Sequence, residues 1–215
     1  GQIFFEERLR EIAAESTEPG ALDQGLVAAT KALGAFLGDT GECPPSPYYC
    51  VLLADGDYMG RAISALATFK EHRAISVALV DFAARASAIV KSRHGSLIYS
   101  GGDDVLALLP LHTALVCAHE LREAFTAAMR EFRVPGKGPP TLSVGLGVSH
   151  HVEPMGAALD LARRAERLAK QGRDAVAGRD AVAVIVQPRG GSPVGKSRRI
   201  VSRIDAPDGE KICSL

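Results

Sequence analysis

The stretch LIYSGGDDVLALLP, residues 97–110, decides the fold, because two short apolar runs meet there at two glycines and two aspartates. The runs predict a pair of strands, and the four residues between them predict a tight hairpin, since glycine tolerates the positive φ that such turns require. One interpretation is a solvated turn that tolerates acidic residues. The other is that Gly101 and Gly102 let an anionic ligand approach the backbone while Asp103 and Asp104 hold a cation.

A second pair of acidic residues follows an earlier apolar run, CVLLADGD, which predicts a strand with Asp55 and Asp57 at its C-terminal end. Helix capping and turn chemistry explain this pair when it is taken alone. In a sheet of this order, however, the strand and the hairpin can lie side by side, which would bring Asp55 and the pair Asp103 and Asp104 to one edge. Carboxylates that close resist joint ionisation unless a cation lies between them.

Oxygen ligands of this kind select Mg²⁺ or Mn²⁺, and magnesium usually keeps waters and substrate phosphates in its shell. Two such ions about 4 Å apart are a common device for activating a hydroxyl and stabilising a leaving phosphate. Two acidic clusters, each ending an apolar strand and each beside glycine, therefore favour a shared metal site at one edge of the sheet.

A third signal is Lys170, which ends a predicted helix and is followed by Gly172 and Arg173. Basic residues stabilise helix C-termini and glycine ends helices, which explains the pattern without any ligand. If the end of this helix reaches the acidic edge, Lys170 would supply a positive charge to a triphosphate.

The remaining pattern predicts an α+β fold in which helices cover one face of a mostly antiparallel sheet. The predicted order is strand, helices, hairpin, helix, strand, helix, strand, with the long helical region 59–93 forming one helix or two. Two helices within 1–47 form an N-terminal extension with a linker, the core spans 48–188, and the composition of 189–215 predicts a linker or arm.

Bulk composition excludes several classes of protein. The chain has 215 residues, is 47% hydrophobic, and has 25 basic and 25 acidic residues, so global disorder and a nucleic-acid-coating role are disfavoured. The four cysteines form no C-x-x-C pair, which favours a reduced cytoplasmic compartment. No apolar run reaches the length of a membrane span, so no membrane partner is expected.

With these residues in place, the chain resembles the palm-type nucleotidyl cyclase and polymerase superfamily, and within it the large subunit of type III-B CRISPR effector complexes. The resemblance rests on LADGDYMG (53–60), SGGDD (100–104) and LAKQGRD (168–174), in matching order and spacing. Diguanylate cyclases are similar, with a related GGDEF turn, but Val105 stands where they have phenylalanine, so guanine specificity is not implied.

The resemblance implies a ferredoxin-like palm that binds ATP with two divalent cations, Mg²⁺ or Mn²⁺, and makes cyclic oligoadenylates. By position, Asp55 and Asp104 would be the principal metal ligands, Asp103 would lie beside them, and Asp57 is a further candidate; Asp103 and Asp104 would be catalytic. The implied nucleotide-binding residues are Gly56, Tyr58, Met59, Gly60, Ser100, Gly101, Gly102, Lys170 and Arg173.

The chain departs from that family, whose large subunit also has a nuclease-like HD domain, a second palm and a helical domain. A single palm holds half of a site for two ATP molecules, so a second palm or a homodimer is an expected partner, with other effector subunits and guide RNA. The glycine start and basic tail indicate an excised palm fragment. The alternatives are a natural minimal palm, a cyclase with another cyclic product, and a non-catalytic assembly module.

Overall fold

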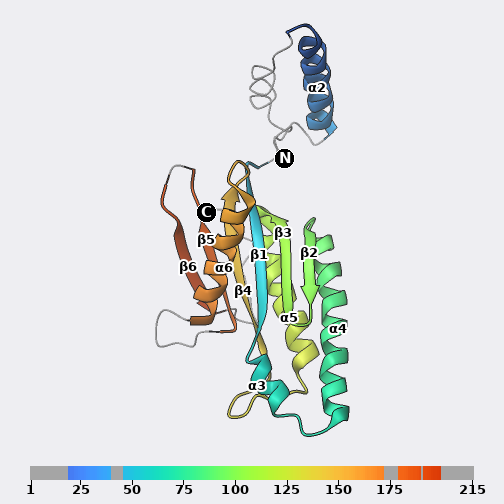
Figure 1. The fold of residues 1–215 in the computed structure, drawn as a ribbon, viewed down its shortest axis with the longest axis vertical. Coiled ribbons are helices and arrows are strands. Elements are labelled where there is room, and N and C mark those ends of the chain that lie inside the picture. Colours follow the sequence, from blue (N-terminus) through green and yellow to red (C-terminus); the bar gives the residue numbers. More distant parts are fainter. Residues whose placement is uncertain (1–18, 40–45, 172–178, 190, 200–215) are drawn as a thin grey trace, which may run out of the picture.

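The computed structural model of the chain describes residues 19–39, 46–171, 179–189 and 191–199, and these form a six-stranded sheet with helices on both faces (Figure 1). The elements are α2 (Pro19–Asp39), β1 (Tyr48–Asp57), α3 (Met59–Ser64), α4 (Phe69–Ser92), β2 (Ser96–Gly101), β3 (Asp104–Pro110), the 3₁₀ helix η2 (Leu111–Thr113), α5 (Ala114–Met129), β4 (Thr141–His150), α6 (Met155–Gln171), β5 (Ala181–Val186) and β6 (Val194–Arg199).

The sheet has the strand order β2-β3-β1-β4-β5-β6. Every neighbouring pair is antiparallel except β4 and β5, which run parallel. The prediction of a mostly antiparallel sheet is therefore confirmed. The central strand β1 lies between β3 and β4, so its C-terminal end is beside the hairpin that joins β2 to β3.

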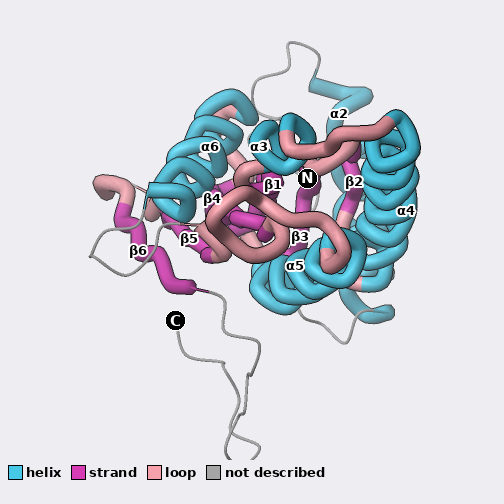
Figure 2. Tube along the Cα trace, turned by 90° about the horizontal axis from the view of Figure 1, so that it is seen from below, coloured by secondary structure: helices cyan, strands magenta, loops and turns pink. Residues whose placement is uncertain are grey.

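The prediction that helices cover only one face of the sheet is wrong. Figure 2 shows α6 on one side of the sheet and α5 with α4 on the other. Alternate residues of β1 face the two layers: Cys50 and Leu52 pack in the α4–α5 core, while Val51 packs with Ala158 and Ala162 of α6. A strand that is buried on both faces reads as a continuous apolar run, and CVLLA is such a run.

Two glycines of β4 let α6 lie directly on the sheet. A Cβ at Gly145 would lie 2.2 Å from the backbone nitrogen of Glu166, and one at Gly147 would lie 2.6 Å from the backbone nitrogen of Ala162. Real Cβ atoms do not approach backbone so closely, so the helix can take this position only because both residues lack a side chain.

The helical region after β1 divides into two helices, α3 and α4, and the second has a strong start signal. The Thr68 side chain accepts a hydrogen bond from the Glu71 backbone N–H, while the Glu71 carboxylate accepts from the Thr68 backbone N–H, which is a capping box. The chain therefore turns between the helices, and α4 runs back along the sheet beside α5.

The C-terminal segment differs in part from the prediction, whereas the described N-terminal helix agrees with it. Strand β6 pairs with β5 at the sheet edge, although its residues fall in the segment 189–215 that was expected to be a linker or arm. Helix α2 confirms the second of two predicted N-terminal helices, while the first, within 3–16, lies outside the described residues.

Helix α2 lies beyond the end of the sheet at which β1 begins (Figure 1). Within the described part of the chain, no helix combines the length and the apolarity that a bilayer crossing needs.

Candidate functional site

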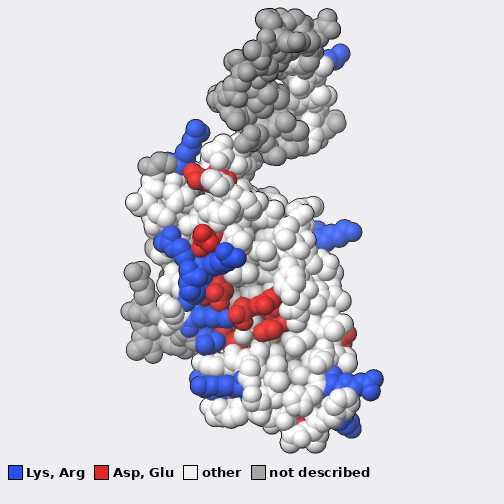
Figure 3. All heavy atoms as spheres, in the orientation of Figure 1, with Lys and Arg blue, Asp and Glu red and all other residues white. Residues whose placement is uncertain are grey.

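The two acidic clusters meet at one end of the strands, where β1 ends beside the β2–β3 hairpin, as the sequence predicts. We call this end of the sheet the acidic edge. The last paired residues of β1 and β3 are Ala54 and Val105, so Asp55 and Asp104 flank that pair on neighbouring strands. By strand alternation both carboxylates extend from the face that carries α6. On this face Figure 3 shows acidic side chains gathered beside basic ones.

The hairpin turn is tighter than predicted, with two residues in place of four. Gly101 pairs with Asp104, which leaves only Gly102 and Asp103 in the turn. Gly102 has a φ of 66°, in the left-handed region that favours glycine. The turn therefore requires glycine at this position, and it leaves the neighbouring Asp103 at the tip of the hairpin.

Asp103 is supported by the backbone of the strand beside it. The Gly56 N–H donates a hydrogen bond to the Asp103 carboxylate, and a Cβ at Gly56 would lie 2.8 Å from the Asp103 Oδ2 atom. The same Cβ would lie 2.7 Å from Met59, whose side chain is buried in the core. Gly56 thus makes room for Asp103, whereas Met59 packs in the core and does not present its side chain to a ligand.

Crowding makes Asp103 and Asp104 reluctant to ionise. Burial raises the pKa of both carboxyls above the ordinary value of 3.8, and the negative charge of Asp55 raises both further. Lys170 opposes these effects in both cases. Among the described residues, the carboxylates of Asp55, Asp103 and Asp104 outnumber the positive charge of Lys170, and an excess of negative charge favours binding of a cation.

Lys170 reaches the acidic edge from the last turn of α6. Its Nζ atom donates a hydrogen bond to Asp55 and lies 2.9 Å from the Glu166 carboxylate. Burial lowers the pKa of Lys170, but these two partners outweigh burial and raise it above the ordinary value of 10.5. Lys170 therefore stays charged at any physiological pH, in the position that the sequence analysis required of it.

Glu166 belongs to this edge, although the sequence analysis missed it. It lies one helical turn before Lys170, and its charge contributes to the raised pKa of Asp104. The signal was present, because glutamate four residues before lysine is a favourable pair on a helix face. That spacing is common on solvated helices, so it does not by itself mark a site.

Asp57 has a different role from the predicted one. It is fully buried, and its carboxylate accepts hydrogen bonds from the hydroxyls of Thr141 (2.8 Å) and Ser143 (2.9 Å) and from the Asp180 backbone N–H (3.0 Å). The Arg179 guanidinium adds a fourth contact at 3.3 Å. Because both oxygens are already bonded within the protein, Asp57 is an anchor between β1, β4 and the start of β5, not a metal ligand.

A cluster of cations surrounds Tyr58, the residue between Asp57 and α3. The Tyr58 ring centroid lies 4.1 Å from Arg179 Cζ, 4.6 Å from Lys137 Nζ and 5.6 Å from Arg61 Cζ. We call Arg61, Lys137 and Arg179 the cation cluster. Tyr58 was predicted from the sequence as a nucleotide contact. The cation cluster around it was not, because its three residues come from separate parts of the chain.

The remaining residues that were predicted to bind the nucleotide do not gather at one place in the structure. Ser100 pairs with Val105 and so faces the α4–α5 layer, where its hydroxyl is buried without a hydrogen-bond partner among the described residues. Gly60 lies in α3 with open space around its Cα. Arg173 and the helix-ending Gly172 lie outside the described residues.

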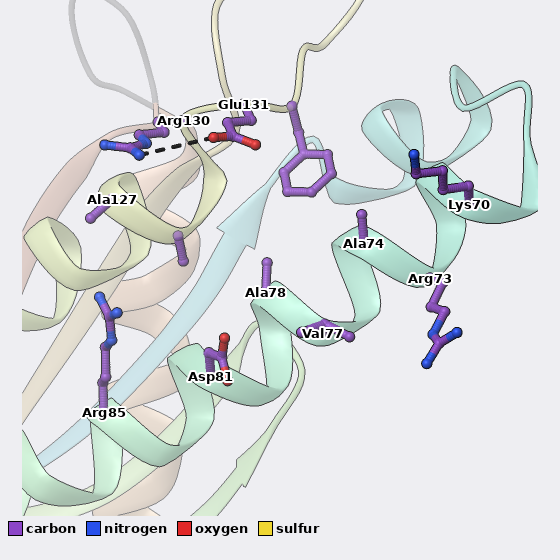
Figure 4. Close-up of a pocket in the computed structure, with 12 residues that line it drawn as sticks. Lys70, Arg73, Ala74, Val77, Ala78, Asp81, Arg85, Ala127, Arg130 and Glu131 are labelled. Atoms are coloured by element: carbon purple, nitrogen blue, oxygen red, sulfur yellow. Dashed lines mark ion pairs between the residues drawn. The ribbon is translucent and has the colours of Figure 1, made fainter.

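Two surface pockets formed by described residues lie away from the acidic residues. One, of about 690 Å³, lies between α4 and the C-terminal end of α5, where Arg130 pairs with Glu131 at 3.9 Å (Figure 4). The other, of about 790 Å³, lies near the start of β1, at the opposite end of that strand from Asp55. Neither pocket is lined by a predicted site residue, so the candidate site is the open, charged edge.

The donor set suits a divalent cation in its chemistry, although no complete cage is formed. Within the described ranges, no three His, Cys, Asp or Glu side chains are already arranged around one point as a metal site. Asp55 and Asp104 offer hard oxygen ligands with excess negative charge. Magnesium is commonly held by one or two carboxylates together with substrate phosphates, and the residues at this edge fit that arrangement.

The fold and this acidic hairpin define a palm domain of the nucleotidyl cyclase and polymerase type. The family model for the second palm domain of Cas10/Cmr2 matches residues 48–183, and the chain belongs to this family. The chain is 33% identical over 174 residues to the CRISPR system Cmr subunit Cmr2 of Pyrococcus furiosus, covering 69% of this chain and 19% of that protein. It therefore spans about a fifth of the length of that curated relative.

Solved structures share the fold at low sequence identity. A chain of a type III-B Cmr-beta complex in the apo state aligns with a TM-score of 0.54 and 15% identity, over 74% of this chain and 28% of that one. A chain of a Csm1–Csm4 cassette in complex with pppApA aligns with a TM-score of 0.50 and 21% identity, over 65% of this chain and 20% of that one.

Proposed function

We propose that this palm is a nucleotidyltransferase that uses ATP and two divalent metal ions, Mg²⁺ or Mn²⁺, to make cyclic oligoadenylate messengers in type III CRISPR antiviral defence. The observation that carries the proposal is the meeting of Asp55, Asp104 and Lys170 on one face, next to a glycine turn. The family and the pppApA bound to a related Csm1–Csm4 cassette support it.

Asp55 and Asp104 would hold the divalent cations, which supply charge neutralisation for phosphoryl transfer when they are bound. Asp103, braced by the Gly56 N–H, adds negative charge beside them. Lys170 keeps its positive charge and binds phosphate oxygens. Positioning and charge stabilisation provide most of the catalysis in phosphoryl transfer, so these residues act by holding the phosphates in place.

The cation cluster would bind the outer phosphates of the nucleotide. Arg179 bonds to Asp57, which lies two residues beyond Asp55 on the same face of β1. The positive charges thus begin a few ångströms past the proposed metal ligands, since two strand residues span about 7 Å. A triphosphate reaching from Asp55 toward Tyr58 would meet Lys170 first and the cluster next.

A single palm offers one half of a site for two nucleotides, so we propose that it works against a second palm, either in a longer chain or in a homodimer. In the full complex, other CRISPR effector subunits and guide RNA would be its partners, in the cytoplasm. A second candidate function is a non-catalytic assembly palm. The hydrogen bond between Lys170 and Asp55 favours it, because the lysine already neutralises a proposed metal ligand.

Calorimetric titration of ATP with Mg²⁺ or Mn²⁺ tests the proposal, with chromatography of the products. We expect metal-dependent binding in the wild type and its loss in Asp103→Asn/Asp104→Asn. Asp160→Asn is the matched control, because Asp160 is exposed on the surface of α6 and its ion pair among the described residues is with Arg163 on the same helix. Binding without product would indicate a missing second palm. Equal binding by wild type and double variant would refute the nucleotide site and favour the assembly role.

Repeating the reaction with each nucleoside triphosphate separates the two enzymatic alternatives. Cyclic oligoadenylate from ATP alone supports the proposed product. A cyclic mononucleotide or dinucleotide in its place would assign the palm to another branch of the nucleotide cyclases.

A further inference from the structure

An exposed aromatic ring lies beside the acidic edge, and the proposed function does not yet use it. Tyr99 on β2 is 55% exposed, and a Cβ at Gly101 would lie 2.1 Å from its Oη atom and 2.5 Å from its Cζ atom. The tip of the ring therefore lies over Gly101, and it can do so only because Gly101 has no side chain. Gly101 pairs directly with Asp104, so the ring is next to a proposed metal ligand.

A β-bulge turns Tyr99 toward this face of the sheet. Leu97 pairs with Ala107, but the register then shifts, so that Tyr99 pairs with Leu106. Without the shift, Ile98 would pair with Leu106 and Tyr99 would point toward the α4–α5 core, as Ala107 does. Bulges commonly redirect a side chain beside an active site, and this one places the ring on the carboxylate face.

The sheet order sets the ring and the cations on opposite sides of the carboxylates. Tyr99 lies on β2, Asp104 on β3 and Asp55 on β1, whereas Lys170 approaches from α6, which packs over β1, β4 and β5. Neighbouring strands are about 5 Å apart, so Tyr99 is one strand from Asp104 and two strands from Asp55. A nucleotide with its phosphates toward Lys170 and the cation cluster has its base directed toward β2.

We infer that Tyr99 is the nucleobase-contacting residue of this palm, its ring forming the surface on which the adenine of bound ATP stacks. The inference rests on the proposed function and adds the group that contacts the base. Stacking of a base on an aromatic side chain tolerates any base, since every base has a π face. Tyr99 therefore contributes affinity for the nucleoside, while the carboxylates and cations contribute affinity for the phosphates.

Calorimetry with two ligands tests this division of roles: Mg²⁺-ATP and Mg²⁺-tripolyphosphate, which has no base. Removing a stacked aromatic ring weakens binding about 5- to 150-fold, so we expect this loss of ATP affinity in Tyr99→Ala. Tripolyphosphate affinity should stay at the wild-type value, and Tyr99→Phe should bind ATP as the wild type does. Ile98→Ala is the control, because Ile98 is the adjacent residue and is 58% exposed.

A second variant moves the ring without removing it. In Gly101→Ala the new methyl group occupies the place of the Tyr99 ring and pushes it off the strand. We expect this variant to lose ATP affinity as Tyr99→Ala does, and the double variant to lose no more than either single one. Additive losses would mean that the two residues act separately, which overturns the inference.

The outcomes separate this inference from the proposed function. If the wild type binds no Mg²⁺-ATP, the proposed function fails and the inference fails with it. If the wild type binds ATP and Tyr99→Ala binds it equally well, or Ile98→Ala loses as much, the nucleotide site stands and the role of Tyr99 is refuted. If Tyr99→Ala weakens tripolyphosphate to the same extent as ATP, the ring supports the phosphate site and does not read the base.

Discussion

Replacing Gly145 with alanine tests whether the close approach of α6 to the sheet places the charged residues of the site. The new Cβ would lie 2.2 Å from the Glu166 backbone nitrogen and 2.5 Å from the Ala162 carbonyl oxygen. Ordinary contact begins near 3.4 Å, so the helix backbone must retreat by the difference, about 1.2 Å, at Glu166. Backbone cannot rotate out of the way as a flexible side chain can.

Overpacking of this kind costs about 1–3 kcal/mol, so the free energy of unfolding should fall by that amount. For a domain of this size the melting temperature should fall by about 2–12 °C. Glu166 and Lys170 move with the helix, so Lys170 should also draw away from Asp55. Binding of Mg²⁺-ATP should therefore weaken together with stability.

Urea unfolding followed by circular dichroism measures the first effect, with Gly156→Ala as the matched control. Gly156 lies in the first turn of α6 and has open space around its Cα, so alanine there should leave stability unchanged or raise it by up to about 1 kcal/mol. Equal stability of Gly145→Ala and the wild type would refute the packing argument. A large loss with unchanged ATP binding would refute the link from packing to the site.

Two further predictions concern the acidic residues. Asp57→Ala should lower the free energy of unfolding by about 3 kcal/mol or more, because the buried groups that donate to Asp57 lose their acceptor. Asp55→Ala should cost less, because the Asp55 side chain is 34% exposed. Equal losses in urea unfolding would contradict the role of Asp57 as a buried anchor. In metal-free protein at low salt, the raised pKa values of Asp103 and Asp104 mean that the folded state binds more protons than the unfolded chain. Their favourable contribution is therefore complete below the unfolded pKa and is lost as pH rises above about 4 through the folded values. In EDTA, the free energy of unfolding of the wild type should therefore fall with rising pH relative to that of Asp103→Asn/Asp104→Asn. A relative increase with rising pH would refute the claim that crowding raises the two pKa values.

The convergence of the acidic clusters could be predicted from the sequence because it depends only on strand pairing. Once CVLLADGD and the hairpin are taken as neighbouring antiparallel strands, the end of one necessarily meets the turn of the other. The sequence predicted that Lys170 ends its helix, and the structure shows that this helix end reaches Asp55. These features are local or set by the strand order, so they can be predicted from the order of residues along the chain.

The covering of both sheet faces could not be predicted from alternation alone. The continuous apolar run of β1 indicates burial on both faces, but it does not show which helix covers the second face, and the placement of α6 depends on tertiary packing. Strand β6 was missed because VGKSRR resembles an exposed arm and gains its structure only by pairing with β5. The cation cluster was missed for a related reason, since Lys137 and Arg179 are 42 residues apart in the sequence and meet only at the Tyr58 ring.

The two aspartates of LADGDYMG show why a shared motif does not imply a shared role. Asp55 and Asp57 extend from the same face of β1, yet Asp55 is partly exposed and faces Lys170, whereas Asp57 is fully buried and bonded. Arg179 joins the second aspartate to the ring of Tyr58, which has a φ of 61° directly before α3. Asp57 therefore positions Arg179 of the cation cluster, whereas Asp55 would supply a metal ligand in the proposed site. If the proposed function holds, one acidic motif would contribute to both ends of a phosphate-binding site, the second through a buried carboxylate that bonds to Arg179 within the protein.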